Sequence, residues 1–299
     1  MKKFFITLIC CSISLFVSAQ EYKLVWEDNF DDGKLNKKIW TPMVSGDGAG
    51  NNEIQYYRAQ NISLGVERET KAKCLIITAK KGEYKKKPCT SGRISTARNI
   101  SVRYGKIEAR IKMPKTANGL WPAFWMLGAD HDQVNWPKCG EIDILEMGKK
   151  TGIHNNVQDR YFNGACHWGE SFNGGSYPNK GVFTTNDYSL QEAFHTFTLI
   201  WTPDSIHMYL DMDLRPNAKP YFELPIVGEG LPNETSRYFR KPFYIIFNLA
   251  VGGNFPNIFD IEKITALESG EAKMYVDYVR VYQKGDAEEM FIQKNKKCK

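Results

Sequence analysis

The chain has 299 residues, of which 42% are hydrophobic and 25% charged. This is typical of a folded globular protein and excludes a disordered chain, a coiled coil, a collagen-like repeat and a disulfide-stapled miniprotein. The net charge of +6 suggests an acidic partner such as nucleic acid, whereas 7 Trp, 15 Tyr and 17 Phe suggest a site that binds by stacking. No stretch combines clustered Lys or Arg with aromatic residues, so the sequence argues against nucleic-acid binding.

The N-terminal segment has the pattern of a signal peptide. Lys2 and Lys3 precede an apolar run over residues 4–17, and the small residues before Gln20 predict cleavage after Ala19. We therefore expect residues 1–19 to be removed and the protein to be secreted or periplasmic. Loss of the two lysines lowers the net charge from +6 to +4. No later stretch approaches the length needed to span a membrane.

Two cysteines fall inside the apolar run and five follow it. Cys10 and Cys11 raise the alternative of a lipoprotein, which Ile9 disfavours because a small residue normally precedes a lipidated cysteine. The five later cysteines have spacings that match no zinc motif; they are Cys74, Cys89, Cys139, Cys166 and Cys298. Cys74 and Cys89 lie on strand-like segments around a lysine-rich turn, so they either face each other or are separate thiols.

Alternating hydrophobicity predicts strands along most of the chain. In chain order they are Lys23–Phe30, Cys74–Lys80, Tyr104–Met113, Pro122–Leu127, Glu141–Glu146, Phe197–Trp201, Ile206–Leu210, Pro242–Val251 and Lys273–Tyr282. In Tyr104–Met113, apolar residues alternate with charged ones, which indicates that the strand has one buried face. The turn-like Thr202-Pro203-Asp204 predicts that the strands beside it form a hairpin. Only Ser189–Phe194 resembles a helix, of about one and a half turns.

Many short strands separated by Gly, Pro and Asn turns predict an all-β sandwich or jelly roll. Such folds reach about 250 residues as one domain, and no linker or repeat divides this chain. We therefore expect one domain over residues 20–284, followed by a charged C-terminal tail over 285–299. The five lysines between Lys80 and Lys87 fall in a predicted turn, which favours a solvated loop over a phosphate-binding patch.

The segment Glu141-Ile142-Asp143-Ile144-Leu145-Glu146 places three carboxylates within six residues. In a regular strand Glu146 would point away from the other two, but a one-residue bulge between Asp143 and Glu146 would bring all three to one face. Crowded carboxylates raise one another's pKa, which indicates an acid–base site. Two of them could serve as the nucleophile and the acid/base of a retaining glycosidase. The alternatives are a calcium site or ordinary surface residues, one of them capping a turn.

A second motif, Gly-Leu-Trp-Pro-Ala-Phe-Trp-Met-Leu-Gly at 119–128, precedes the acidic segment. Together the two resemble glycoside hydrolase family 16, specifically its bulged branch, which includes the laminarinases (endo-1,3-β-glucanases). The resemblance covers nearly the whole chain after the signal peptide and includes Val25–Phe30, Asn51–Tyr57, Ser91–Ile94, Phe243–Gly253 and Tyr275–Tyr282. One departure is Asn29, which stands where an acidic residue is common in the family.

The resemblance implies a jelly roll of two curved antiparallel sheets with a concave sugar-binding cleft. It implies that Glu141 is the nucleophile, Glu146 the general acid/base and Asp143 the assisting residue of a double displacement that retains configuration and needs no cofactor. The implied reaction is cleavage of internal β-1,3-bonds of a laminarin-type glucan by a monomer. The alternatives are a mixed-linkage 1,3-1,4-β-glucanase, a galactanase of the same family, and a non-catalytic carbohydrate-binding jelly roll.

Several further residues are expected to contact the substrate. Trp121 and Trp125 share parity with Ala123, so both can face the cleft, where an indole offers a flat apolar face and an N–H donor. Trp136 is expected to join them from the loop before the acidic segment, whereas the structural tryptophans are expected to be Trp26, Trp40 and Trp201. The resemblance adds His167, Asn51, Arg93 and Asn248. Each of these four could instead be a satisfied polar group or fix a loop, and Arg93 could instead pair with the acidic cluster.

Many members of the family carry a structural calcium ion on the convex side, one ligand of which comes from the last strand. Asp277 stands at the matching position in this chain. The resemblance therefore implies a structural calcium ion with Asp277 among its ligands.

Overall fold

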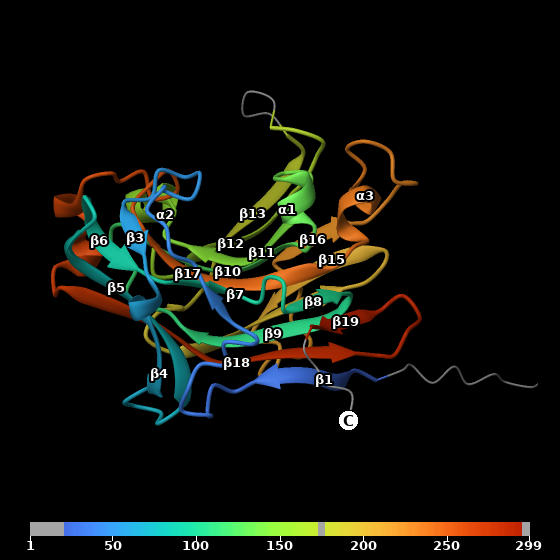
Figure 1. The fold of residues 1–299 in the computed structure, drawn as a ribbon, viewed down its shortest axis with the longest axis horizontal. Helices are drawn as coiled ribbons and strands as arrows, with labels where there is room; N and C mark the ends of the chain where they lie inside the picture. Colours follow the sequence, from blue (N-terminus) through green and yellow to red (C-terminus); the bar gives the residue numbers. More distant parts are fainter. Residues whose placement is uncertain (1–20, 173–176, 295–299) are drawn as a thin grey trace, which may run out of the picture.

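The computed structural model describes residues 21–172 and 177–294. The expected signal peptide (1–19), the lipoprotein alternative at Cys10 and Cys11, and Cys298 lie outside the described residues. Within them, strands dominate and form two sheets that pack face to face (Figure 1), which confirms the predicted all-β sandwich. None of the helices in the described part of the chain is long and apolar enough to cross a membrane.

The first sheet has ten strands. Its order is β16 (Phe222–Pro225), β15 (Ser205–Leu210), β14 (Phe194–Trp201), β9 (Gly105–Lys112), β18 (Glu271–Gln283), β5 (Lys73–Tyr84), β6 (Lys87–Ser91) and β3 (Gln55–Tyr57). In addition, β1 (Lys23–Asp28) pairs with β18, and β4 (Ile62–Val66) pairs with β5. Only the pairing of β3 with β6 is parallel among the strand pairs described. The predicted hairpin is confirmed as β14 and β15, whose register places Phe197 opposite Leu210.

The second sheet has nine strands and carries the site described below. Its order is β13 (Asn179–Thr185), β12 (Tyr161–His167), β11 (Glu141–Met147), β10 (Leu120–Gly128), β17 (Phe243–Val251), β7 (Arg93–Ser95) and β2 (Thr41–Pro42). Strand β8 (Ile100–Arg103) pairs with both β17 and β19 (Met290–Gln293). Short helices occupy the connections: α1 (His131–Val134), α2 (Lys150–His154), α3 (Thr235–Phe239), and the 3-10 turns η1 (Ala59–Asn61), η2 (Ile261–Lys263) and η3 (Thr265–Leu267).

The core lies between the two sheets, and the alternation in the sequence explains it. On β9 the apolar residues Ile107, Ala109 and Ile111 are completely buried, while the charged residues between them point to the opposite face. Each fully buried large apolar side chain contributes about 1.5–3 kcal/mol. Two of the tryptophans expected to be structural, Trp40 and Trp201, are almost completely buried in this core. The third, Trp26, is half-buried and stacks on Phe291.

The predicted helix at Ser189–Phe194 is wrong. The segment is not helical: Gln191 forms an isolated bridge with Met113, and Glu192 has a positive φ of 62°. The backbone N–H of Leu190 donates to Asp159, and that of Glu192 donates to Met113. Bonds to distant segments therefore satisfy this backbone, and they outweigh a weak local preference for helix over so short a stretch.

The predicted charged tail at 285–299 is also wrong in part. Met290–Gln293 forms β19, which pairs along the full length of β8, and Phe291 packs against the core. Before the strand, the carboxylate of Glu289 accepts the backbone N–H groups of residues 284, 285 and 286. The segment is polar overall, but its three consecutive apolar residues, Met290, Phe291 and Ile292, form most of this strand.

The four cysteines within the described residues are buried and free. Cys74 lies opposite Gly65 on β4, whereas Cys89 lies opposite Lys81 on β5. Position 81 is seven residues from Cys74 along β5, about 23 Å at the rise of a strand. The alternative in which Cys74 and Cys89 face each other is therefore wrong, and they are separate thiols whose pKa burial raises to about 12. The predicted lysine-rich turn is confirmed only in part: Lys85 and Lys86 form the exposed turn between β5 and β6, whereas Lys80 and Lys81 lie on β5 and Lys87 begins β6.

Candidate active site

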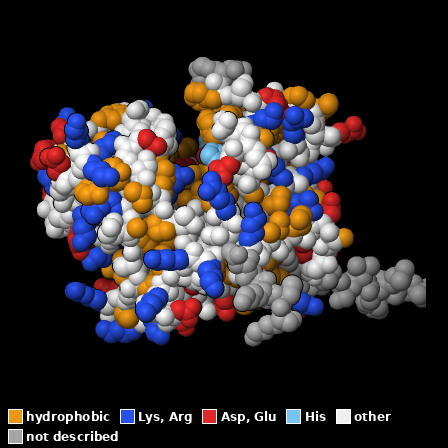
Figure 2. Space-filling model, viewed as in Figure 1, with side chains coloured by type: hydrophobic (Ala, Val, Ile, Leu, Met, Phe, Trp, Pro, Cys, Tyr) orange, Lys and Arg blue, Asp and Glu red, His pale blue; other side chains and the backbone are white. Residues whose placement is uncertain are grey.

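A cleft of about 520 Å³ crosses the outer face of the nine-stranded sheet. The space-filling view shows the molecule hollowed between two raised parts of its surface (Figure 2). On one side rise α1 and the end of β13, and on the other α2 and β3 (Figure 1). The floor comes from β10, β11, β12 and β17, whose cleft-facing residues alternate with residues of the core.

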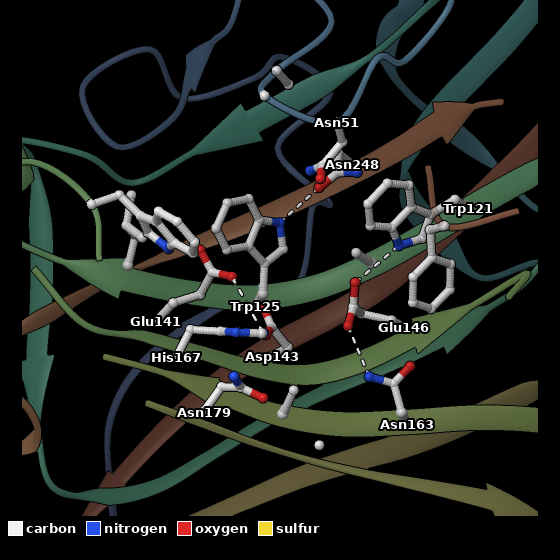
Figure 3. Close-up of a pocket in the computed structure, with 18 of the residues that line it drawn as sticks. Asn51, Trp121, Trp125, Glu141, Asp143, Glu146, Asn163, His167, Asn179 and Asn248 are labelled. Atoms are coloured by element: carbon white, nitrogen blue, oxygen red, sulfur yellow. Dashed lines mark hydrogen bonds and ion pairs between the residues drawn. The ribbon is translucent and has the colours of Figure 1, made fainter. Parts of the chain in front are cut away.

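The predicted bulge in the acidic strand is confirmed. Opposite β12, Asp143 pairs with Ala165 and Glu146 pairs with Asn163, so β11 has one residue more than its partner. Ile144 and Leu145 both turn into the core, and the hydroxyl of Tyr221 donates to the carbonyl of Ile144 inside the bulge. The bulge reverses the parity of the strand, so that Glu141, Asp143 and Glu146 all line the cleft (Figure 3).

Glu146 is held by two hydrogen bonds from different strands. The indole N–H of Trp121 donates to Oε1 at 3.0 Å, and the amide of Asn163 donates to Oε2 at 2.8 Å. Both donors are visible on either side of the carboxylate in Figure 3. Because each oxygen has its own donor, the orientation of this carboxylate in the cleft is fixed, as a group that transfers protons to a bound substrate requires.

Glu141, Asp143 and His167 form the other half of the acidic cluster. His167 Nε2 lies 3.2 Å from Asp143 Oδ2 and 3.9 Å from Glu141 Oε1. Burial, followed by the charge of Asp143, raises the pKa of Glu141 to about 8. Burial and the charge of Glu146 likewise raise the pKa of Asp143 well above its usual range. The Glu141–Asp143 pair therefore holds a proton at neutral pH.

The same three groups have ligand atoms within 4.8 Å of one another, close enough to hold a metal ion. Calcium prefers oxygen ligands, six to eight in number. A set of two carboxylates and one imidazole nitrogen does not fit that preference. The cluster therefore favours a shared proton over the calcium alternative considered for the acidic segment.

Both tryptophans of β10 that were expected to face the cleft do line it. The indole N–H of Trp125 donates to Asn248 Oδ1 at 2.7 Å, and the guanidinium of Arg93 lies 4.6 Å from the centre of the Trp125 ring. Arg93 thus stacks on an indole face and forms no ion pair with the acidic cluster among the described residues, although its charge opposes the rise in the pKa of Glu141. Asn51 also lines the cleft, at the side opposite His167 (Figure 3).

Trp136 reaches the cleft from the segment after α1, as expected. Its ring meets that of Tyr177 edge to face, with ring centres 4.7 Å apart, and lies 5.6 Å from Phe172 and 6.3 Å from His167. These aromatic side chains form a wall beside Glu141, suited to the apolar faces of sugar rings. The sequence reading did not find Phe172 and Tyr177, because they come from a connection without a motif.

Asn163 and Glu53 were also missed, although the sequence carries a signal for each. Asn163 shares parity with His167 on β12, so extending the alternation by four residues would have placed it in the cleft. Glu53 lines the cleft while almost fully buried. The hydroxyl of Tyr57 and the amide of Gln55 both donate to its Oε2, at 2.7 and 2.6 Å. These three residues alternate within the quoted segment 51–57.

Asp277 lies outside the cleft, on the ten-stranded sheet. Arg110 Nη1 donates to its Oδ2 at 2.6 Å, so this carboxylate is already neutralised by a cation. The arrangement does not favour Asp277 as a ligand of a metal ion, and the structural calcium ion stays a prediction.

Comparisons with known proteins agree with this geometry. The model of glycosyl hydrolases family 16 matches residues 49–221. The chain is 33% identical to a beta-glucanase of Rhodothermus marinus, over 89% of this chain and 86% of that protein. It is 35% identical, over 92% of this chain, to the clotting factor G alpha subunit of Tachypleus tridentatus, of which it spans only 35%.

Solved structures show the same similarity. A Bacteroides ovatus family 16 protein, described with mixed-linkage glucan and a G4G4G3G product, superposes with a TM-score of 0.74 at 36% identity, covering 86% of this chain and all of that one. The catalytic domain of an endo-1,3-beta-glucanase (laminarinase) of Thermotoga petrophila gives 0.70 at 31% identity, covering 90% of this chain and all of that one. With three carboxylates on a bulged strand of a jelly-roll cleft, the chain belongs to glycoside hydrolase family 16.

Proposed function

We propose that the chain is a retaining endo-β-glucanase that hydrolyses internal β-1,3-bonds of laminarin-type glucans. The observation that carries this proposal is the bulge, which presents Glu141, Asp143 and Glu146 together in a cleft lined with aromatic side chains. A non-catalytic sugar-binding protein gains nothing from burying three adjacent carboxylates, because each charge raises the cost of the others.

The residues divide the two steps of a double displacement between them. Glu146, fixed by Trp121 and Asn163, gives its proton to the glycosidic oxygen while the carboxylate of Glu141 attacks the anomeric carbon. The leaving sugar departs as an alcohol and a glycosyl ester with Glu141 remains. Glu146 then takes a proton from water, which attacks the same carbon and frees Glu141.

Glu141 must be an anion to attack, although burial raises its pKa to about 8. We assign the proton that the buried pair shares to Asp143 in the reacting form, since the pKa of Asp143 is also strongly raised. Asp143 lies between the two glutamates on the same face of β11. It can therefore hold this proton for Glu141, and the negative charge of Glu146 favours the protonated form of Asp143.

Mixed-linkage 1,3-1,4-β-glucan is the second candidate substrate. The Bacteroides ovatus neighbour is described with such a glucan, while the Thermotoga petrophila neighbour is described as a laminarinase. The 119–128 motif, which resembles laminarinases, supports β-1,3-glucan as the first candidate, although bulged enzymes can act on both glucans. Product profiles on laminarin, mixed-linkage glucan and agarose, measured side by side, would rank the substrates, and a ladder of oligosaccharides would show endo action.

The decisive experiment is Glu141→Ser. We expect this variant to release no reducing sugar from laminarin, because it lacks the nucleophile, while it still binds laminari-oligosaccharides in calorimetry. Unchanged hydrolysis would contradict the assignment of Glu141. A wild-type protein that binds these oligosaccharides without releasing reducing sugar would instead identify a non-catalytic sugar-binding protein.

We also propose that the protein is secreted or periplasmic after cleavage following Ala19. The support for this is the sequence pattern of residues 1–19 alone. N-terminal sequencing of the protein recovered outside the cytoplasm should begin at Gln20. A lipidated cysteine at the N-terminus would contradict this proposal in favour of the lipoprotein alternative.

A further inference from the structure

Lys149 is a half-buried cation that forms no ion pair with a carboxylate in the described part of the chain. It follows the acidic strand, directly before α2, and lines the cleft. Its Nζ lies 4.3 Å from the centre of the Phe183 ring and 5.0 Å from that of Phe255. Other lysines that are shielded from water, such as Lys112 and Lys241, form ion pairs with carboxylates. Within the ranges that the structure describes, no carboxylate lies at ion-pair distance from Lys149.

The rings around Lys149 connect it to Glu146. Phe255 stacks on Trp121 with ring centres 4.6 Å apart and planes 10° from parallel, and the N–H of Trp121 donates to Glu146. Phe183 lies across from Phe255, with centres 6.5 Å apart. We call these four residues (Trp121, Lys149, Phe183 and Phe255) the Glu146 wall. It brings together β10, the loop after β17, the edge strand β13 and the start of α2.

The Glu146 wall combines the two features that bind a sugar. Its rings present flat apolar faces, which suit the C–H faces of a pyranose. The ammonium of Lys149 has three N–H donors. The ring faces attract its positive charge but do not accept hydrogen bonds from all three N–H groups. Burial lowers the pKa of Lys149, an effect that the negative charge of Glu146 opposes. Lys149 therefore has N–H donors that an oxygen atom of a ligand in the cleft can accept.

We propose that Lys149 binds the leaving-group sugar, the unit on the reducing side of the cleaved bond, by donating hydrogen bonds to its hydroxyl oxygens. This assignment rests on the proposed function, in which Glu146 protonates the glycosidic oxygen. The leaving sugar is attached to that oxygen, so it lies beside Glu146, and we assign it to the side of the wall that contains Lys149. Lys149 is then a specificity-determining residue that favours a sugar over other leaving groups.

The test compares two β-1,3-glucosides that differ in their leaving group. Laminarin has a sugar as leaving group, whereas phenyl β-laminaribioside releases phenol, which still needs a proton from Glu146 but has no sugar hydroxyls. We expect Lys149→Met to lose about tenfold in kcat/KM on laminarin, the equivalent of one good hydrogen bond. On the phenyl glycoside we expect less than a twofold change. Methionine preserves the apolar contact with both phenylalanines, so the fold should be kept.

Two further variants serve as controls. Lys149→Arg keeps the charge and the donors and should recover most of the activity on laminarin. Lys150→Met removes the adjacent lysine, whose side chain is exposed, and should leave both rates unchanged. Equal losses of Lys149→Met on both substrates would overturn the assignment, because they would place the effect of Lys149 on Glu146. Unchanged rates on both would also overturn it. No wild-type turnover of either substrate would overturn the proposed function as well.

Discussion

The carboxylates compared on the two outer faces of the sandwich have opposite electrostatic surroundings. On the ten-stranded sheet two of them are paired with cations: Glu67, only 3% exposed, lies 3.2 Å from Lys112, and Asp277 lies 2.6 Å from Arg110. Although burial opposes it, hydrogen bonds from the backbone of Thr70 and Glu69, and from Lys112, lower the pKa of Glu67 to about 2. In the cleft, burial and like charges raise the pKa of Glu141 to about 8.

The difference lies in where the cations point. Two cationic side chains of the cleft face aromatic rings, Arg93 over Trp125 and Lys149 between two phenylalanines. The acidic cluster is left with hydrogen-bond donors and with His167. One face thus uses its charges for stability, while the other keeps acids at elevated free energy, as acid–base chemistry requires. Three substitutions test this contrast.

The largest effect should come from Glu146→Ala. Loss of the group that gives and takes the proton should lower kcat/KM on laminarin by about 10³-fold, with little change in the unfolding temperature. Reducing-sugar assays and thermal unfolding would measure the two quantities. Glu83→Ala, which removes an exposed carboxylate near the end of β5, is the matched control and should keep full activity. A loss in kcat/KM below tenfold for Glu146→Ala would contradict the role of Glu146 as acid/base.

On the opposite face, Lys112→Met should destabilise the protein without touching the cleft. It leaves the buried carboxylate of Glu67 without its cation, which should cost about 3 kcal/mol in the free energy of unfolding. Because the folded pKa of Glu67 is about 2, its stabilising effect is complete above about pH 4.5 and is lost as the pH falls towards 2.

Urea unfolding at pH 7 and pH 3 would check both statements, with a smaller difference between variant and wild type at pH 3. The control is Lys81→Met, which removes an exposed pair with Glu262 and should cost less than about 1 kcal/mol. A cost for Lys112→Met no greater than that of the control would contradict the role given to the buried pair.

The smallest expected effect is an increase in the free energy of unfolding, opposite in sign to the decrease expected for Lys112→Met. Glu141→Gln should inactivate the enzyme but raise the free energy of unfolding by about 1 kcal/mol at pH 8. The folded pKa of Glu141, about 8, lies above its unfolded value, so the wild type loses stability as the pH rises through this range. At pH 4 the wild-type carboxyl is protonated in both states and the gain should vanish. Urea unfolding at both pH values would decide, and a gain independent of pH would contradict the electrostatic explanation.

The parts of the site that were predictable are those with a strict period. Parity along one strand placed Trp121 and Trp125 in the cleft, and parity plus a bulge did the same for Glu146, because side chains alternate between faces. The jelly roll followed from repeated strands and turns. His167, Arg93, Asn51 and Asn248 required the family resemblance, since a single polar residue carries no period.

What could not be predicted depends on contacts between distant segments. Phe255 and Tyr177 reach the cleft from connections whose course is set by packing, and nothing near them in sequence marks their destination. The non-helical backbone at Ser189–Phe194 is fixed by partners at Met113 and Asp159, more than 30 residues away for the second. Strand β19 is similar, because its register on β8 joins positions nearly 190 residues apart.

The extra residue in β11 also determines where this gene can change in length. Deleting one of the two residues between Asp143 and Glu146 would remove the bulge, and regular alternation would keep Glu146 on the cleft face with Asp143. Deleting Ile142 would instead make Glu141 and Asp143 neighbours, whose side chains point to opposite faces of the strand. We therefore expect the single residue between Glu141 and Asp143 to be kept in active descendants, whereas the stretch between Asp143 and Glu146 can lose one residue together with the bulge.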